Sequence, residues 1–589
     1  MSLGPGPYDL LIEGGLVFDG RGNAPRRLSV GIRGGQIADL FEPSAAHERP
    51  ASREVVSAHG QWVMPGFIDF HTHYDAEVEV APSLSESLRH GVTTVFLGSC
   101  SLSLAVGSPD ELADMYCRVE ALPDEVVRPL LRAAKTWEGH ADYYRHLDAL
   151  PLGPNVASFV GHSAIRANVM GIERSLERGV VPTAQELSRM RDLVGEGLDE
   201  GYVGLSIQTL PWDKMGGTEP YRSRPLPSTF ARWSEYRALL QEVRARDRVF
   251  QGVPNVSTKV NALLFMLESV PLFDRKPLKT TIISMMDLVG ERGIHRVIGA
   301  LARFVNSVMG GDFRWQALPE PFDLWADGLD LVVFEEFGAG AAALHLADPD
   351  QRSALLRDPE YRARFRREWR HPILPRAFHR NLALARVLSS PDASLAGKTF
   401  AEIAKDRGRD AVDVFLDLVA THGTRLRWTT MMANDREGSL LEIIGHPDVL
   451  IGFSDAGAHL RQMAHYSFPL RMLRRVQTAH QAGRPAMSLE RAVHRLTGEI
   501  ASWFGIAAGH LDVGARADVV VVDPAGLTDR LEDVCEAVIE GFGAHTRLVR
   551  RSEDATTLVV VGGRVASRRG VVDAAVGHER GFGRVLRAL

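Results

Sequence analysis

The middle of the chain alternates short apolar runs with helical patterns, and this alternation constrains the fold most strongly. Runs of β-type residues separated by helical segments indicate a parallel sheet covered by helices. Helical patterns lie over 184–200, 233–246 and 292–307. Eight such βα units over about 250 residues or more have the size of a TIM barrel. We therefore predict an α/β fold with a (β/α)8 barrel, whose candidate strands cover 67–71, 93–98, 156–160, 203–207, 249–253, 280–284, 313–318 and 450–453.

The two ends of the chain share a different pattern, in which short Val-, Ile- and Leu-rich runs are punctuated by glycine. Such runs occur within 8–64 and again at 517–523 and 557–566. We predict that residues 1–64 and 509–589 pair into one small β-sandwich domain, while 65–508 form the barrel. Two separate β-caps are the alternative, because short apolar runs alone do not identify their pairing partners.

The stretch 319–425 is too long for a single βα loop. Helix-like patterns near 351–370 and 377–388 predict a mainly helical insertion. Because it follows the seventh candidate strand, and the loops after barrel strands face the active site, we expect it at the carboxyl face of the barrel or in a subunit contact.

Composition narrows the class of protein. The chain has 589 residues, 45% hydrophobic and 24% charged, with a formal net charge of −6. This is typical of a globular protein, and the absence of a basic block argues against a nucleic-acid partner. We see no signal peptide and no apolar run long enough for a membrane span. Three cysteines fit a reducing compartment, so we expect a cytoplasmic protein that acts on a small molecule, and the sequence allows a homo-oligomer.

The strongest local signal is Pro65-Gly-Phe-Ile-Asp-Phe-His-Thr-His, an apolar run that ends in His71 and His73. Residues two apart on a strand point to the same face, and active sites of TIM barrels lie at the carboxyl ends of the strands. A pair of imidazoles there suits zinc or a similar divalent ion. Taken alone, the pair is equally consistent with two hydrogen-bonded structural histidines.

Potential functional side chains also follow two later strands. Cys100 ends the run 90–100, and its thiolate is a zinc ligand type, although a single cysteine is more often a small buried apolar residue. His162 and Arg166 follow the run 155–161. His162 is a candidate to orient a carbonyl or stabilise an oxyanion, and Arg166 to bind substrate. A loop histidine bonded to backbone and an arginine in a structural ion pair are the competing interpretations.

The last candidate strand leads into Gly452-Phe-Ser-Asp-Ala-Gly-Ala-His. Asp455 is a candidate metal ligand and proton carrier, whereas an isolated aspartate at a strand end is usually a cap or turn residue. His459 and Arg461 lie just beyond and are candidates to bind a substrate carboxylate, for which the arginine fork is well suited.

As a set, these motifs resemble the amidohydrolase superfamily, in its N-acyl-D-amino-acid deacylase (D-aminoacylase) branch. The run 65–73 resembles the first-strand signature of the superfamily, and 90–100 resembles the segment in which D-aminoacylases carry a metal-binding cysteine. Residues 160–171 and 452–457 are similar to further motifs of that branch, and 510–523 resembles the return to the small β-domain. All five occur in the family's order.

The resemblance implies a TIM barrel with a β-sandwich made from both termini, and metal-assisted hydrolysis of an amide. It also implies that His71, His73, Cys100 and Asp455 bind the metal, with zinc the expected ion. Asp455 would accept the proton of the attacking water and deliver it to the leaving amine.

The chain departs from the family at two strand ends. D-aminoacylases carry one histidine after strand five and another after strand six, whereas Gln251 and Ser284 are the nearest polar residues here. We therefore predict one divalent ion rather than two. The departure also leaves room for a metal-dependent hydrolase or lyase of another small molecule (a cyclic amide, a lactone or a C–C bond), or for a metal-free scaffold. A measurement of the metal content of the protein distinguishes the metal-free scaffold from the metal-dependent enzymes.

Overall fold

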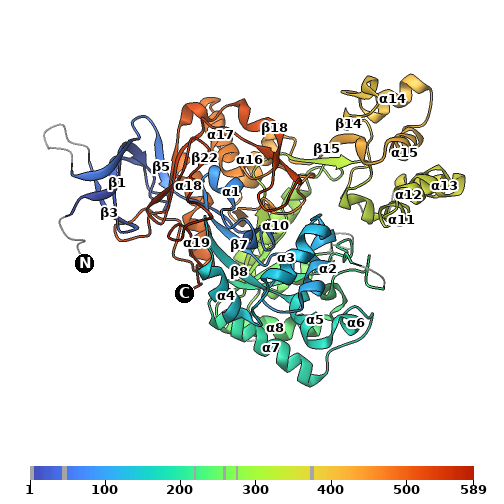
Figure 1. Cartoon of the computed structure of the whole chain (residues 1–589), viewed down its shortest axis with the longest axis horizontal. Coiled ribbons are helices and arrows are strands. Elements are labelled where there is room, and N and C mark those ends of the chain that lie inside the picture. Colours follow the sequence, from blue (N-terminus) through green and yellow to red (C-terminus); the bar gives the residue numbers. More distant parts are fainter. Residues whose placement is uncertain (1–5, 43–49, 218–219, 256–259, 273–275, 372–376) are drawn as a thin grey trace.

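The computed structural model describes residues 6–42, 50–217, 220–255, 260–272, 276–371 and 377–589. Eight parallel strands form one curled sheet (Figure 1). The segment after the first strand pairs with the segment after the last, because Phe70 N–H donates to Gly452 O at 3.1 Å and His73 N–H to Ala456 O at 2.7 Å. The predicted TIM barrel is confirmed, with strands β6 (Phe67–Asp69), β7 (Val92–Leu97), β8 (Asn155–Gly161), β9 (Gly204–Gln208), β10 (Val249–Val253), β11 (Lys279–Ile282), β12 (Asp312–Ala317) and β16 (Val449–Ile451).

Aromatic and aliphatic side chains fill the barrel interior. The ring of Phe504 packs against Phe96 with centroids 4.9 Å apart and against Phe70 at 5.4 Å. Some of the surrounding helices begin at side-chain caps; Thr183 and Glu186, for example, form a reciprocal capping box at the start of a helix. These helices are α1 (Ser85–Arg89), α2 (Pro109–Val119), α3 (Asp124–Ala134), α4 (His140–Ala149), α5 (His162–Met170), α6 (Ile172–Ser175), α7 (Ala184–Asp199), α8 (Trp233–Ala245), α9 (Val260–Glu268), α10 (Ile294–Val308), α16 (Glu437–Gly445), α17 (Phe468–Gln481), α18 (Leu489–Leu496) and α19 (Gly498–Phe504).

Strands from both ends of the chain form one nine-stranded sheet. The two halves meet where Val520 pairs antiparallel with Met64. Alternating inward-facing Leu, Ile and Val side chains give this sheet a core of its own. Its strands are β1 (Tyr8–Val17), β2 (Arg26–Arg33), β3 (Gln36–Phe41), β4 (Ser52–Ser57), β5 (Trp62–Pro65), β17 (Val519–Val522), β20 (Thr556–Val561), β21 (Arg564–Arg568) and β22 (Val571–Val572), and a separate hairpin contains β18 (Val534–Val538) and β19 (Thr546–Arg550).

The segment between β12 and α16 forms a separate lobe, which Figure 1 shows on the side of the barrel away from the terminal sheet. It contains helices as expected, but also a three-stranded antiparallel sheet in the order β13-β15-β14. The helix predicted over 377–388 is wrong, because 377–384 form bends and a turn and 385–389 form a strand that pairs with 427–430; residues 372–376 lie outside the described residues. The elements are β13 (Phe322–Asp327), α11 (Gly338–Leu344), α12 (Pro349–Arg357), α13 (Pro359–Trp369), β14 (Ala385–Ser389), α14 (Phe400–Arg407), α15 (Ala411–His422) and β15 (Arg427–Ala433).

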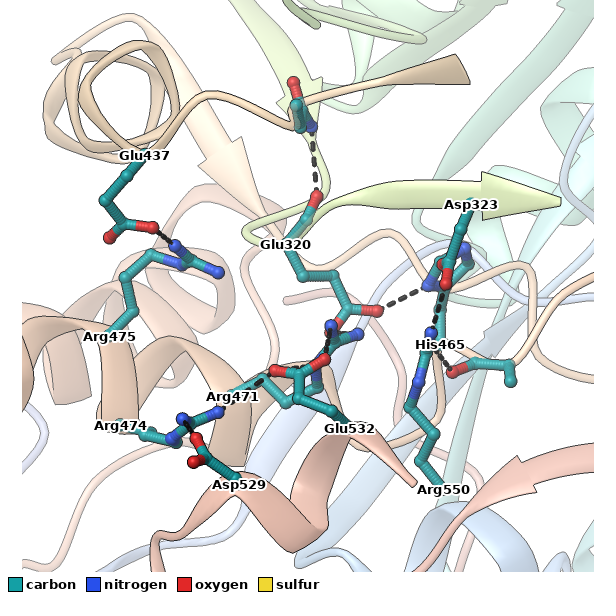
Figure 2. A network of polar contacts seen from close by, with 12 residues as sticks. Glu320, Asp323, Glu437, His465, Arg471, Arg474, Arg475, Asp529, Glu532 and Arg550 are labelled. Carbon is teal, nitrogen blue, oxygen red and sulfur yellow. Dashed lines mark hydrogen bonds and ion pairs between the residues drawn. The ribbon is translucent and has the colours of Figure 1, made fainter. Parts of the chain in front are cut away.

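A network of buried charges fixes the root of this lobe to the rest of the molecule (Figure 2). Glu320, just before β13, is fully buried and ion-pairs with Arg471 of α17 at 2.5 Å and with His465. Arg471 also binds Glu532 of the C-terminal segment. Charges taken out of water need such partners, so this network holds three distant parts of the chain in one arrangement.

Within the described part of the chain, no helix combines the length and apolar composition that a membrane crossing needs. All three cysteines are free, and Cys117 is buried whereas Cys535 is exposed.

Candidate metal centre

The predicted metal ligands converge above the barrel. His71 and His73 follow β6, Cys100 follows β7 and Asp455 follows β16. One ligand atom from each of His71, His73 and Cys100 lies within 4.8 Å of the others. Asp455 Oδ1 lies 3.4 Å from His71 Nε2 and 3.6 Å from His73 Nε2. Four donor groups of the types that zinc prefers therefore surround one point.

The spacing of these atoms fits a tetrahedral ion. Ligands about 2.0–2.3 Å from zinc at tetrahedral angles lie roughly 3.3–3.6 Å from one another. His71 Nε2 is 3.2 Å from Cys100 Sγ, close to this range, and the two contacts of Asp455 Oδ1 fall within it. These three separations are thus compatible with one divalent ion among these side chains.

Protonation at His71 also suits metal binding. His71 Nδ1 lies 2.5 Å from Gln316 Oε1, an amide oxygen that only accepts, so Nδ1 carries the proton and Nε2 presents its lone pair. Burial lowers the pKa of His71 to about 4, which keeps its ring neutral. Burial alone would raise the pKa of Asp455, but the hydrogen bond with His73 and the charges of both histidines lower it. The neutral imidazole and the carboxylate are the forms that bind metals.

Burial raises the pKa of the Cys100 thiol to about 12 in the metal-free chain. Thiolate ligation therefore requires the ion to displace the thiol proton, as is usual for cysteine ligands. Cys100 and Asp455 have φ angles of 55° and 54°. Left-handed backbone conformations at non-glycine residues are costly and occur preferentially at functional sites. Their presence at both residues supports a functional role for this site.

Glu120, one residue beyond α2, is a member of the site that the sequence analysis missed. Its side chain is 2% exposed, and its Oε1 lies 3.3 Å from His73 Nδ1. Burial alone would lower the pKa of His73, but the negative charge of Glu120 raises it well above its usual value, with Cys100 adding to the effect. No motif surrounds Glu120, and only the folded arrangement brings it to His73.

Gln251, where the family has a histidine, performs a different task. Its Oε1 accepts a hydrogen bond from Cys100 N–H at 3.1 Å, and its Nε2 lies 3.4 Å from His71 Nδ1. The amide oxygen thereby holds the Cys100 turn, and Nε2 donates to Ser99 Oγ at 3.4 Å. Ser284 instead lines the cavity beside the centre.

A cavity of about 440 Å³ opens beside the metal ligands. His73, Cys100 and Asp455 form part of its wall, together with Glu120 and His459. Most of the other lining side chains are apolar; they come from the loops after β10 and β11, from α9 and α10, and from the root of the inserted lobe. The lobe thus contributes to the carboxyl face of the barrel.

The structure places the remaining predicted site residues differently. His459 lines the cavity, with its Nε2 3.9 Å from Glu120 Oε2. His162 is fully buried and bonds Glu235 Oε1 at 3.0 Å and Ser228 Oγ at 2.9 Å.

The two predicted substrate-binding arginines also form ion pairs away from the cavity. Arg166 Nε donates to Glu235 Oε1 at 2.9 Å, deep beneath α5 and α8. Arg461 ion-pairs with Asp327 and Glu536, both at 2.8 Å, beside a surface hollow. His162, Arg166 and Arg461 are therefore not brought to the lining of the cavity.

No family model matches the chain. An uncharacterized protein of Mycobacterium tuberculosis (strain ATCC 25618 / H37Rv) is 47% identical over 566 residues, which cover 96% of this chain and 92% of the relative. A D-aminoacylase of Alcaligenes xylosoxydans xylosoxydans is 26% identical over 532 residues, or 89% of this chain and 90% of the relative.

Solved structures share the fold. A D-aminoacylase superposes with a TM-score of 0.64 at 22% identity, covering 99% of this chain and 100% of the other. The N-acyl-D-glutamate deacylase of Bordetella bronchiseptica superposes with a TM-score of 0.63 at 23% identity and the same coverage. Together with the ordered motifs and the four converging ligands, these relatives show that the chain belongs to the D-aminoacylase-like branch of the amidohydrolase superfamily, whose named relatives here are amide hydrolases.

Proposed function

We propose that this protein is an amidohydrolase that uses one divalent ion, with zinc the expected metal, to hydrolyse an N-acyl amino acid or a closely related amide. The observation that carries the proposal is the convergence of His71, His73, Cys100 and Asp455 beside an enclosed cavity. An ion held there polarises the scissile carbonyl and activates water near neutral pH.

The chain's own residues supply proton transfer and positioning. Asp455 is buried with a lowered pKa, so it stands as a carboxylate at the reacting centre. We assign it the role of taking the proton of the attacking water and passing it to the leaving amine. Glu120 Oε1 lies 3.3 Å from His73 Nδ1 in an ion-pair contact, and we assign it the role of fixing the orientation of that ring.

A single ion is favoured by the side chains at the two departures from the family. The solved D-aminoacylase has a binuclear centre in which one metal activates and the second attenuates. Here the neutral amide of Gln251 is already engaged with Cys100 N–H and Ser99 Oγ. Amide and hydroxyl oxygens are weaker ligands for zinc than imidazole, which argues against a second tightly held ion.

A hollow beside the centre contains three basic side chains that suit the carboxylate of an N-acyl amino acid. It shares Trp212 and His459 with the cavity and is lined by Arg118, Lys214 and Arg222, and also by Asp330 and Glu335. Arg118 is paired with Glu335 at 2.6 Å, whereas Lys214 is half-buried and burial lowers its pKa. We therefore place the substrate carboxylate near Lys214 rather than near Arg166 or Arg461.

The test is hydrolysis of paired substrates, N-acyl-D-amino acids and their carboxamides, with the L-isomers alongside. We expect the parent to hydrolyse an N-acyl amino acid, and Lys214→Met to raise KM about tenfold for the carboxylate but not for the carboxamide, since one charge-assisted contact is worth about 1.5 kcal/mol. Arg461→Met is the control, with both KM values unchanged. No hydrolysis of any amide by the metal-loaded protein would refute the function, and equal effects on both substrates would refute the role of Lys214.

A further inference from the structure

We infer that the apolar part of the cavity binds a long alkyl acyl group, so that the preferred substrates are N-fatty-acyl amides rather than N-acetyl ones. The inference rests on the proposed function and names the acyl chain on which it acts.

One part of the cavity lining is rich in aliphatic side chains, which we call the aliphatic wall. It contains Leu263 and Met266 of α9, Ile298 and Leu301 of α10, and Ile283 after β11, and Glu291 before α10 also lines the cavity. The whole cavity of about 440 Å³ has room for on the order of a dozen groups of methylene size, if each takes the ~30 Å³ of a water molecule. The reacting amide occupies the polar part of this volume, and an acetyl group would leave the space along the aliphatic wall unfilled.

The same wall continues onto the protein surface. Leu263 and Leu301 line the cavity and are nevertheless 43% and 36% exposed. From Leu301 an exposed apolar row runs along one face of α10 through Val297, Phe304 and Val308, which are spaced at helical intervals. Contiguous exposed apolar surface is uncommon unless it binds something. We infer that a chain longer than the cavity leaves it past Leu263 and Leu301.

The basic side chains beside the cavity set the orientation of the substrate. Arg118, Lys214 and Arg222 lie in the hollow formed by α2 and the segment after β9, on another sector of the barrel rim. The carboxylate side of an N-acyl amino acid is attracted there, whereas the lining of the aliphatic wall includes no lysine or arginine among the described residues. The scissile carbonyl then lies at the candidate metal ligands, between this hollow and the aliphatic wall. The acyl chain therefore extends along the aliphatic wall.

The experiment compares acetyl, hexanoyl and decanoyl derivatives of one amino acid with the metal-loaded protein. We expect kcat/KM to rise with chain length by up to about fourfold per methylene, which corresponds to about 0.8 kcal/mol. Leu263→Glu and Leu301→Glu place a charge at the mouth and should cut decanoyl turnover at least about tenfold, a much larger loss than for acetyl turnover. Val308→Glu, on the same helix but away from the cavity lining, is the matched control and should keep the full chain-length effect.

Titration calorimetry with decanoate and hexanoate gives a readout that does not need turnover. Decanoate should bind at least about tenfold more tightly to the parent and to Val308→Glu, and this preference should disappear in Leu263→Glu. Equal binding of both acids, or turnover that depends on the amino-acid side chain and not on acyl length, would overturn the inference while leaving the proposed function intact.

Two other results distinguish a failure of the proposed function from a failure of the acyl-chain inference. Decanoate binding without hydrolysis of any amide would refute the proposed function but support the apolar site. A change of oligomeric state in Leu263→Glu and Leu301→Glu, with chain-length dependence unaltered, would assign the apolar surface to a second copy of the chain and overturn the inference.

Discussion

At the scale of single residues, side chains from three strand ends make the candidate metal centre. His71, His73, Cys100 and Asp455 each follow a barrel strand, and the strand ends bring them together. Glu120 and Gln316 contact the two histidines from positions 47 and 245 residues away along the chain. No motif marks these two residues, because their contacts depend on the packed structure.

Glu120→Gln tests the orientation of His73. The amide retains the shape of the carboxylate but loses the charge that stabilises the His73 N–H, so both metal affinity and kcat/KM should fall by about 10- to 100-fold. Competition with a chelator measures the metal affinity, and steady-state kinetics measure kcat/KM. Glu138→Gln, at an exposed position beyond α3, should change neither. An unchanged metal affinity in Glu120→Gln would remove Glu120 from the centre.

At the scale of elements, strand and helix periodicity identified the barrel because each βα unit is a local pattern. The strand β14 was missed because Ala377 to Leu388 has apolar residues at helical spacing, yet Val387 pairs with Trp428 of β15. Non-local pairing overrides local propensity. The network in Figure 2, which joins the inserted lobe to α17, was likewise invisible in the sequence.

Glu320→Gln tests that network through stability. Burial alone would raise the pKa of Glu320, but the charge of Arg471 and the hydrogen bond with His465 lower it. Because the folded-state pKa lies below the unfolded value of about 4.3, the carboxylate stabilises the fold at neutral pH and this contribution is lost as the pH falls through the folded-state pKa. We expect a loss of about 3–5 kcal/mol in the free energy of unfolding at pH 7, since buried Arg471 loses its partner, and a smaller loss in acid.

Urea denaturation at several pH values measures this effect. Glu437→Gln is the matched control, because Glu437 also pairs with an arginine of α17 but its side chain is 56% exposed; it should cost less than about 1 kcal/mol. Equal losses in the two variants, or a loss for Glu320→Gln that grows as the pH falls, would contradict the role given to the network.

At the scale of the whole molecule, the barrel lies between the terminal sheet and the inserted lobe (Figure 1). The order of the motifs was sufficient to predict the barrel and the joining of the two ends. The shape and polarity of the cavity were not predictable, because its wall combines α9, α10 and the lobe root with the ends of barrel strands. The ion pairs of the two arginines were not predictable for the same reason, because Arg166 and Arg461 meet their acidic partners only in the folded chain.

The metal content of the purified protein tests the central claim most directly. Elemental analysis without chelator, after zinc loading and removal of excess ion, should give about one equivalent per chain. His71→Ala should lose it, because one of four ligands is gone, whereas Gln251→Ala should retain it and His480→Ala, far from the site, should match the parent. No bound ion in the zinc-loaded parent, or an equivalent that survives in His71→Ala, would contradict the metal centre described here.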